Sequence, residues 1–218
     1  MDILVEDNEK LAEFVGILTG DGFISNSSNS SKIGIVCDAT KDREYVSEYV
    51  SKLWFELFKV PFRLFYRSDN TIRVYKYSNE VANFLSVLGF PIGKKGNLPM
   101  LDFVKSSPKL WAHFIRGFFD TDGCIFWDKR KIYSKPYPRI YLVTISKRLA
   151  EDISYCLKEL GFNVFSQTRK RNELVSRQYS IELYGYKNLK RWLDLIGSSN
   201  KTKRDKLKLC LSGSVVER

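Results

Sequence analysis

The sequence Phe14-Val15-Gly16-Ile17-Leu18-Thr19-Gly20-Asp21-Gly22-Phe23 returns in residues 115–124 as Ile115-Arg116-Gly117-Phe118-Phe119-Asp120-Thr121-Asp122-Gly123-Cys124. Each copy is largely apolar, has small residues four positions apart and ends in an acid followed by glycine. The two acids, Asp21 and Asp122, stand close to half of the 218-residue chain apart. A duplicated half with one carboxylate at the same point of each copy predicts two pseudo-symmetric lobes whose acids meet at a shared axis. Two carboxylates brought together need a cation between them, because like charges repel.

Each motif is predicted to lie on a helix. The first helix can be capped by Asp7 or Asn8, and the second begins with Ser107 as N-cap and Pro108 in the first helical position. Small residues spaced by four allow two helices to approach backbone to backbone. These residues are Gly16 and Gly20 in the first motif, and Gly117 and Thr121 in the second. We therefore predict that the two motif helices pack side by side.

The similarity of the two halves continues beyond the motifs. Hydrophobic alternation and turn residues predict matching elements in the same order. The predicted elements are strands at 33–36 and 140–143, helices near 42–58 and 147–160, and hairpins at 62–67 with 71–77 and at 163–168 with 176–184. Each half is thus expected to run helix, two strands, helix, two strands, helix, which is an α/β (α+β) fold. We assign residues 1–105 and 106–218 to the two lobes.

Strand periodicity separates an inner face from an outer face in each hairpin. Ile72, Val74, Ile181 and Leu183 are expected to face the core. The alternate positions carry arginine, glutamine, serine and tyrosine, which can hydrogen-bond base edges in a major groove. The main candidates for DNA contact are Arg63, Arg67, Arg73, Tyr75, Gln167, Arg169, Gln178 and Tyr184, with Ser180 and Glu182 facing outward beside them. Secondary candidates by the same parity are Ser25, Ser27, Asn29, Asp128, Arg130, Arg139 and Tyr141.

Composition narrows the classes of function. Lys and Arg number 36 and Asp and Glu 25, a net charge of +11, which is typical of proteins with a polyanionic partner. Residues 1–107 have a net charge of −1 and residues 108–218 one of +12, so we expect more phosphate contacts from the second half. The four cysteines form no Cys-x-x-Cys pair and His113 is the only histidine, which argues against zinc fingers and histidine-based nucleases. No apolar run approaches the roughly 18 residues of a membrane span, and we expect an intracellular protein with reduced thiols.

Residues 14–22 and 115–123 resemble the nine-residue signature of the LAGLIDADG homing endonucleases, in the single-chain form with two motifs. The resemblance implies paired motif helices at the lobe interface and two curved antiparallel sheets that form a saddle over double-stranded DNA. It implies a monomer that hydrolyses one phosphodiester in each strand. It also implies that Asp21 and Asp122, with Gly20 and Thr121, bind Mg²⁺, with Mn²⁺ or Ca²⁺ as substitutes in binding. A hard divalent ion prefers oxygen ligands and activates its bound water.

Three lysines resemble the active-site lysine of the family, which offsets negative charge at the scissile phosphate. These are Lys95 in the first half and Lys201 or Lys203 in the second. Asp120 occupies an acidic position of the signature, but residues i and i+2 do not share a helix face, so we leave it out of the metal site. The amide often found after the second strand is missing, since Ala39 takes its place. Asp38, Thr40 and Ser146 remain open as candidates for positioning water.

A non-cleaving nucleic-acid binder is the alternative, either a regulator or an RNA maturase with intron RNA as a further partner. Retention of both motif aspartates favours the nuclease, because a binder has no need for two desolvated carboxylates close together. A self-splicing intein is not expected, because the sequence has neither a nucleophile at its first position nor a terminal asparagine.

Overall fold

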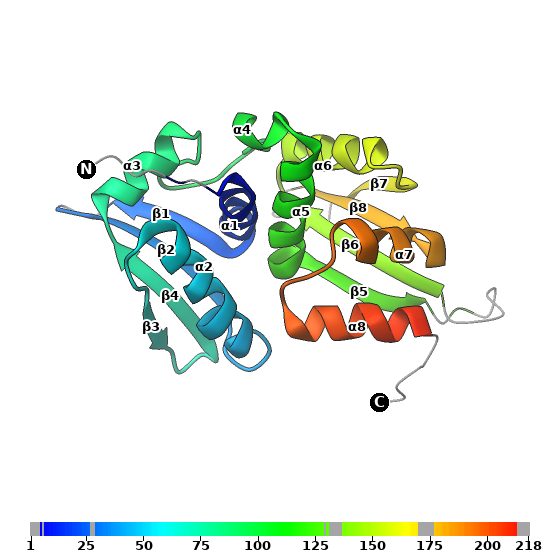
Figure 1. Cartoon of the computed structure of the whole chain (residues 1–218), viewed down its shortest axis with the longest axis horizontal. Helices are drawn as coiled ribbons and strands as arrows, with labels where there is room; N and C mark the ends of the chain where they lie inside the picture. The colour runs from blue at the N-terminus through cyan, green and yellow to red at the C-terminus, as the bar shows by residue number, and fades with distance from the viewer. Residues whose placement is uncertain are drawn as a thin grey trace.

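The computed structural model describes residue 5 and residues 7–26, 29–128, 130, 137–169 and 177–212. It shows two lobes, each with a four-stranded antiparallel sheet (Figure 1). The first lobe runs α1 (Asn8–Asp21), β1 (Gly22–Asn26), β2 (Ser31–Asp38), the π-helical turn η1 (Tyr45–Val50), α2 (Ser51–Phe58), β3 (Arg63–Tyr66), β4 (Thr71–Tyr77) and α3 (Asn79–Val87). The short helix α4 (Asp102–Lys105) then leads into the second lobe.

The second lobe repeats this order and adds a helix. Its elements are α5 (Pro108–Asp122), β5 (Gly123–Asp128), β6 (Tyr137–Thr144), α6 (Lys147–Glu159), β7 (Val164–Arg169), β8 (Gln178–Tyr184), α7 (Gly185–Leu195) and α8 (Lys201–Ser212). The sheets have the equivalent strand orders β1-β2-β4-β3 and β5-β6-β8-β7. Gly22 pairs with Ile35 in one sheet and Gly123 with Leu142 in the other, so the two registers correspond. The predicted α+β architecture is confirmed, while α4 and α8 were not predicted.

The motif helices α1 and α5 lie side by side between the two sheets (Figure 1). They meet at two glycines. A Cβ placed on Gly16 would lie 2.1 Å from the carbonyl oxygen of Phe114, and one on Gly117 would lie 2.1 Å from the carbonyl oxygen of Glu13. Because both distances are far below van der Waals contact, each glycine lets one helix touch the backbone of the other, as predicted from the spacing.

The core lies between the helices and the inner faces of the sheets. Ile72, Val74, Ile181 and Leu183 are buried there, which confirms the inward parity of both hairpins. α1 is buried around most of its circumference because it packs on its own sheet on one side and on α5 on the other. None of the described helices is long and apolar enough to cross a membrane.

The structure specifies the starts of the two motif helices. Of the two predicted caps of α1, Asp7 is the N-cap and accepts a hydrogen bond from the Lys10 amide. Ser107 holds the N-cap position of α5, but its side chain makes no capping hydrogen bond. The strands, and the helices predicted near 42–58 and 147–160, differ from their expected bounds by a few residues at most. The reason is that fraying and turn geometry, rather than the hydrophobic pattern, set where an element ends.

Ser180 and Glu182 lie on the outer face of their sheet, as strand parity predicted. Each is nevertheless only 3% exposed. The Ser180 hydroxyl donates to the Glu182 carboxylate at 3.0 Å, and Arg139 and Tyr184 lie beside that carboxylate. Strand parity assigns a side chain to a face of the sheet, but neighbouring side chains decide whether water reaches it.

The glycine contact between the helices gives a stability prediction. Gly117→Ala should lower the free energy of unfolding by about 1–3 kcal/mol or more, because the new methyl group must displace the α1 backbone. Chemical denaturation measures the change. Val87→Ala, at a side chain that is 88% exposed, is the control and should shift stability by less than about 0.5 kcal/mol. Equal stability of Gly117→Ala and the parent would contradict this helix contact.

Candidate metal and nucleic-acid site

The two motif acids are the last residues of α1 and α5. Each is followed by a glycine, Gly22 or Gly123, where the chain leaves the helix and enters the first strand of its lobe. The Asp122 side chain lies against the other motif, since a Cβ on Gly20 would be 2.6 Å from Asp122 Oδ2. The structure therefore brings Asp21 and Asp122 together at the pseudo-twofold axis.

The surroundings of both carboxylates raise their pKa values. Desolvation and then the negative charge of Asp21 raise the pKa of Asp122 to about 6. Desolvation also raises the pKa of Asp21, while the lysines nearby act in the opposite direction. Asp122 remains exposed to solvent, so water or a ligand can reach it even though protein atoms crowd its surroundings. A pair of this kind attracts a cation.

Two lysines flank the pair with matching contacts. Lys95 Nζ donates to the carbonyl oxygens of Leu18 and Thr19 at 3.3 and 2.8 Å, and to that of Gly20. Lys203 Nζ donates to the carbonyl oxygens of Phe119, Thr121 and Gly123 at 2.8, 3.0 and 2.7 Å. Each ammonium thus caps the C-terminal turn of a motif helix, where the helix dipole favours positive charge.

Burial lowers the pKa of both Lys95 and Lys203, while Asp21 and Asp122 raise it. The third lysine candidate, Lys201, points elsewhere and pairs with Glu44 at 3.4 Å between two exposed side chains. Of the three lysines, the structure therefore brings Lys95 and Lys203 to the motif acids and leaves Lys201 outside.

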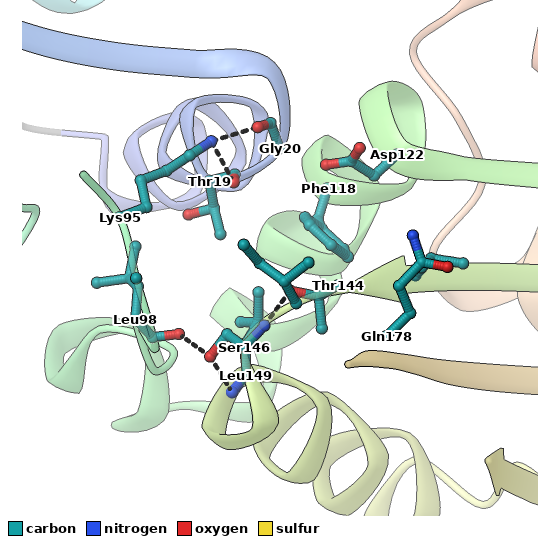
Figure 2. Close-up of a pocket in the computed structure, with 13 residues that line it drawn as sticks. Thr19, Gly20, Lys95, Leu98, Phe118, Asp122, Thr144, Ser146, Leu149 and Gln178 are labelled. Atoms are coloured by element: carbon teal, nitrogen blue, oxygen red, sulfur yellow. Dashed lines mark hydrogen bonds between the residues drawn. The ribbon is translucent and has the colours of Figure 1, made fainter. Parts of the chain in front are cut away.

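A pocket opens beside Asp122 between the lobes. Figure 2 shows Lys95 on one side of it, and Thr144, Ser146 and Gln178 on the other. Thr144 stands at the position of the second sheet that corresponds to Cys37 in the first, because the two registers are equivalent. The two halves of the site therefore differ in detail, since a threonine in the second lobe takes the place of a cysteine in the first.

The two motif carboxylates suit a hard divalent ion that takes its remaining ligands from solvent and a phosphate. Asp21 and Asp122 supply two carboxylates, and the described residues hold no cluster of three or more His, Cys, Asp or Glu that could ligate a metal. The Gly20 and Thr121 carbonyls, which we predicted as part of the metal site, accept hydrogen bonds from Lys95 and Lys203 in this structure. Oxygen donors with an incomplete shell are typical of sites that bind Mg²⁺ together with a substrate phosphate.

The candidates for positioning water hold structural contacts. The Asp38 carboxylate accepts from the amides of Thr40 and Lys41 at 2.8 and 2.9 Å and so closes a turn after β2. Ser146 caps α6 and donates to the carbonyl oxygen of Leu98 at 2.7 Å. A role of Asp38, Thr40 or Ser146 in positioning water therefore stays a prediction.

The outer face of the first sheet is basic and aromatic. Lys32 lies over the ring of Tyr75 at 4.2 Å, and Tyr75 pairs across the sheet with Arg63. Arg73 pairs with the exposed Phe65 on the same face. Arg67 follows β3 and forms an ion pair with Asp69 at 3.1 Å. Arginines and a lysine beside aromatic rings suit a polyanionic partner with stacked bases.

The outer face of the second sheet is organised by acids. Arg139 contacts Asp128 at 2.6 Å and lies over the ring of Tyr184 at 4.4 Å. Tyr184 donates to Glu182 at 2.5 Å, and Arg130 pairs with Asp128 at 2.8 Å. Asp128, a predicted contact, is buried and orients arginines. Buried carboxylates thus fix the arginines of this face in place.

The remaining candidates fall on or beside these faces. Ser25 pairs with Lys32 in the first sheet, while Tyr141, Gln167, Arg169 and Gln178 share the outer face of the second. Asn29 is exposed between β1 and β2. Ser27 lies outside the described residues. The structure thus places the described candidates in positions consistent with a DNA interface.

Sequence reasoning missed two neighbours of Asp21. The Cys37 thiol lies 3.7 Å from Asp21 Oδ2, and the charge of Asp42 raises the pKa of Asp21. Alternation along β2 points Cys37 toward α1, but no sequence pattern linked Asp42 to the site. Asp120, which we left out of the metal site, is buried between α5 and the segment that precedes α8.

This fold and site define a class of protein with two motif helices at its centre and two sheets beside them. Residues 110–197 match the family model of the LAGLIDADG-like domain. Over 92% of this chain there is also 33% identity to a replication factor C small subunit from Methanocaldococcus jannaschii, but the chain spans about a tenth of that relative's length.

Solved structures show the same fold. The homing endonuclease I-DmoI in complex with DNA and Ca has a TM-score of 0.63 at 13% identity, covering 93% of this chain and 97% of that chain. The homing endonuclease I-WcaI bound to its DNA recognition sequence has a TM-score of 0.62 at 16% identity, covering 92% and 88%. The predicted resemblance is confirmed, since residues 110–197 match the LAGLIDADG-like domain and the whole chain has the two-lobed fold of the LAGLIDADG structures.

The raised pKa of Asp122 predicts a pH effect on stability without metal. Its pKa of about 6 in the folded protein exceeds the ordinary 3.8, so the folded state binds the proton more tightly than the unfolded state. The resulting stabilisation is full below about pH 4 and is lost as the pH rises through about 6. In buffer with a chelator, the Tm of the parent minus that of Asp122→Asn should therefore fall between pH 4 and 7. Asp102→Asn, at an exposed acid of α4, is the control, and a constant Tm difference for Asp122→Asn would refute the predicted coupling.

Proposed function

We propose that this protein is a site-specific endonuclease that cleaves both strands of a long asymmetric DNA target with a divalent metal ion, Mg²⁺ in the first instance. The carrying observation is the meeting of Asp21 and Asp122 at the pseudo-twofold axis, one carboxylate from each lobe. One acid per lobe suits a single chain that must cut two antiparallel strands. The likeness to homing endonucleases bound to DNA supports this proposal.

The chain's own residues have separable tasks in this mechanism. Asp21 and Asp122 hold the metal, which when bound supplies an activated water and neutralises charge on the phosphate. Lys95 and Lys203 place two further positive charges beside the carboxylates and can offset charge at the scissile phosphate. α1 and α5 fix these groups in place, because the glycine contact leaves the helices little freedom to slide.

The outer faces of the sheets supply binding. The basic and aromatic first sheet and the arginines of the second face the same polyanion in this proposal, with the net charge of +11 supporting its capture. Side chains such as Arg73 and Gln167 can read base edges, while other cations contact phosphate. The DNA partner and the monomeric action of the chain belong to this proposal.

The motif acids give the main functional test. A target is first selected by incubating the parent with a plasmid library and Mg²⁺. Asp21→Asn and Asp122→Asn should each abolish double-strand cleavage of that target and leave at most slow nicking of one strand, because the amide cannot replace the charge that holds the metal. Binding of uncut target should persist or strengthen, since repulsion from phosphate falls.

Asp102→Asn is the matched control, because α4 lies at the opposite end of α5 from Asp122 (Figure 1). It should cleave like the parent. Full double-strand cutting by either motif variant would overturn the assignment of the acids. A parent that binds the DNA but never cuts it would favour the non-cleaving binder.

Non-specific binding should depend steeply on salt. For a random duplex, log Kd should rise linearly with log salt, at a slope of about 0.9 for each phosphate neutralised. Fluorescence anisotropy between low and moderate salt measures this slope. Arg73→Gln should reduce it by about one if that side chain contacts phosphate, and should leave it unchanged if the side chain contacts bases. A flat response of the parent would exclude the basic faces as a DNA surface.

A further inference from the structure

Asp120 is a buried acid that the mechanism above does not use. It is 2% exposed and lies in the last turn of α5, two residues before the helix ends at Asp122. Its carboxylate accepts hydrogen bonds from the Ser198 hydroxyl, from the Ser199 amide at 2.7 Å and from the Asn200 amide at 3.1 Å. One buried carboxylate thus holds three consecutive residues of the segment between α7 and α8.

That segment sets where α8 begins. Asn200 Oδ1 accepts hydrogen bonds from the amides of Thr202 and Lys203 at 3.1 and 3.4 Å, so Asn200 caps the helix. Lys203 lies in this first turn, and its ammonium reaches three carbonyl oxygens at the end of α5. A continuous chain of contacts therefore runs from Asp120 through Asn200 to the lysine beside the motif acids.

The first lobe lacks this arrangement. Thr19 stands at the motif position that Asp120 occupies in the second lobe, and its hydroxyl donates to the carbonyl oxygen of Val15 in its own helix at 2.7 Å. Lys95 lies in a non-helical segment between α3 and α4. The two lysines thus make similar final contacts, but only Lys203 is carried by a helix whose start is held by a buried acid.

The same segment also touches the first lobe. The Ser199 hydroxyl donates to the Glu13 carboxylate at 2.6 Å, and Asn200 Nδ2 donates to Asp42 at 3.0 Å. A purely structural role for Asp120, fixing one lobe against the other, is therefore the competing explanation. The two roles differ in one respect, because fixing one lobe against the other does not by itself couple Asp120 to Lys203.

We propose that Asp120 is a positioning residue that fixes Lys203 in the active site through the Ser198–Asn200 segment and the first turn of α8. This inference rests on the proposed nuclease function for its catalytic readout, but the chain of contacts can be tested without catalysis. It gives the acid at this motif position a role that is neither metal binding nor substrate contact, and it makes the second half of the site more rigidly built than the first.

Asp120→Asn tests the proposal. The asparagine oxygen can still accept from the Ser199 and Asn200 amides, but its NH2 group cannot accept from the Ser198 hydroxyl. The charge that strengthens all three hydrogen bonds is also lost, so the anchor of the segment is weakened. The single-turnover cleavage rate should fall about tenfold or more, since misplacing a catalytic group by about 1 Å can cost about 10²-fold. The double variant Asp120→Asn/Lys203→Met should be no slower than Lys203→Met alone. Asp120→Asn/Lys95→Met is the control, and there the two effects should multiply.

Amide hydrogen exchange provides the readout that does not need cleavage. In Asp120→Asn, the amides of Thr202 and Lys203 should exchange faster, while the first turn of α6, which Ser146 caps independently, should not change. The proposal would be overturned if the amides of α8 exchanged in Asp120→Asn at the same rates as in the parent. It would also be overturned if the losses of cleavage rate from Asp120→Asn and Lys203→Met multiplied in the double variant. If Asp120→Asn does not fold, Asn200→Ala breaks the same chain of contacts beyond the acid and must show the same coupling to Lys203. A parent without nuclease activity would refute the proposed function, while the exchange result would still decide the contact chain.

Discussion

Backbone contact between α1 and α5 is the constraint on which the rest of the structure depends. At Gly16 and Gly117, a single methyl group would lie 2.1 Å from a carbonyl oxygen of the facing helix. Because both helices end in an acid and a glycine, close approach of their axes also brings Asp21 and Asp122 together. The same contact places one sheet on each side of the axis. Packing of the two helices therefore determines both the fold and the candidate site.

Bringing two acids together has an electrostatic cost that the structure offsets in part. Desolvation and mutual repulsion raise the pKa of Asp122, and burial lowers the pKa of Lys95 and Lys203. Both ammonium groups donate to carbonyl oxygens at the helix ends, and within the described residues neither forms an ion pair with Asp21 or Asp122. The carboxylate oxygens, open to solvent at Asp122, are therefore suited to a divalent cation.

The two halves are related by duplication but do not work alike. The outer face of the first sheet carries cations on tyrosine rings, whereas Asp128 and Glu182 hold the arginines of the second. Lys203 stands on a helix capped by Asn200, whereas Lys95 stands on an irregular segment. Such differences suit an asymmetric target, because each lobe can treat its own half of the DNA differently.

Much could be read from the sequence alone, since the information was local or repeated. The paired motifs and the strand periodicity predicted the α+β lobes and the helix pairing. The family resemblance indicated Lys95 and either Lys201 or Lys203, and only the structure distinguished Lys203 from Lys201. Tertiary structure decided the rest, because it depends on which distant side chains cover one another. Strand parity could not show that Glu182 is buried under its neighbours, nor spacing that Cys37 touches Asp21. The contact of Asp120 with residues 198–200 joins parts of the chain that no local pattern relates, and only the folded chain gives that acid a role.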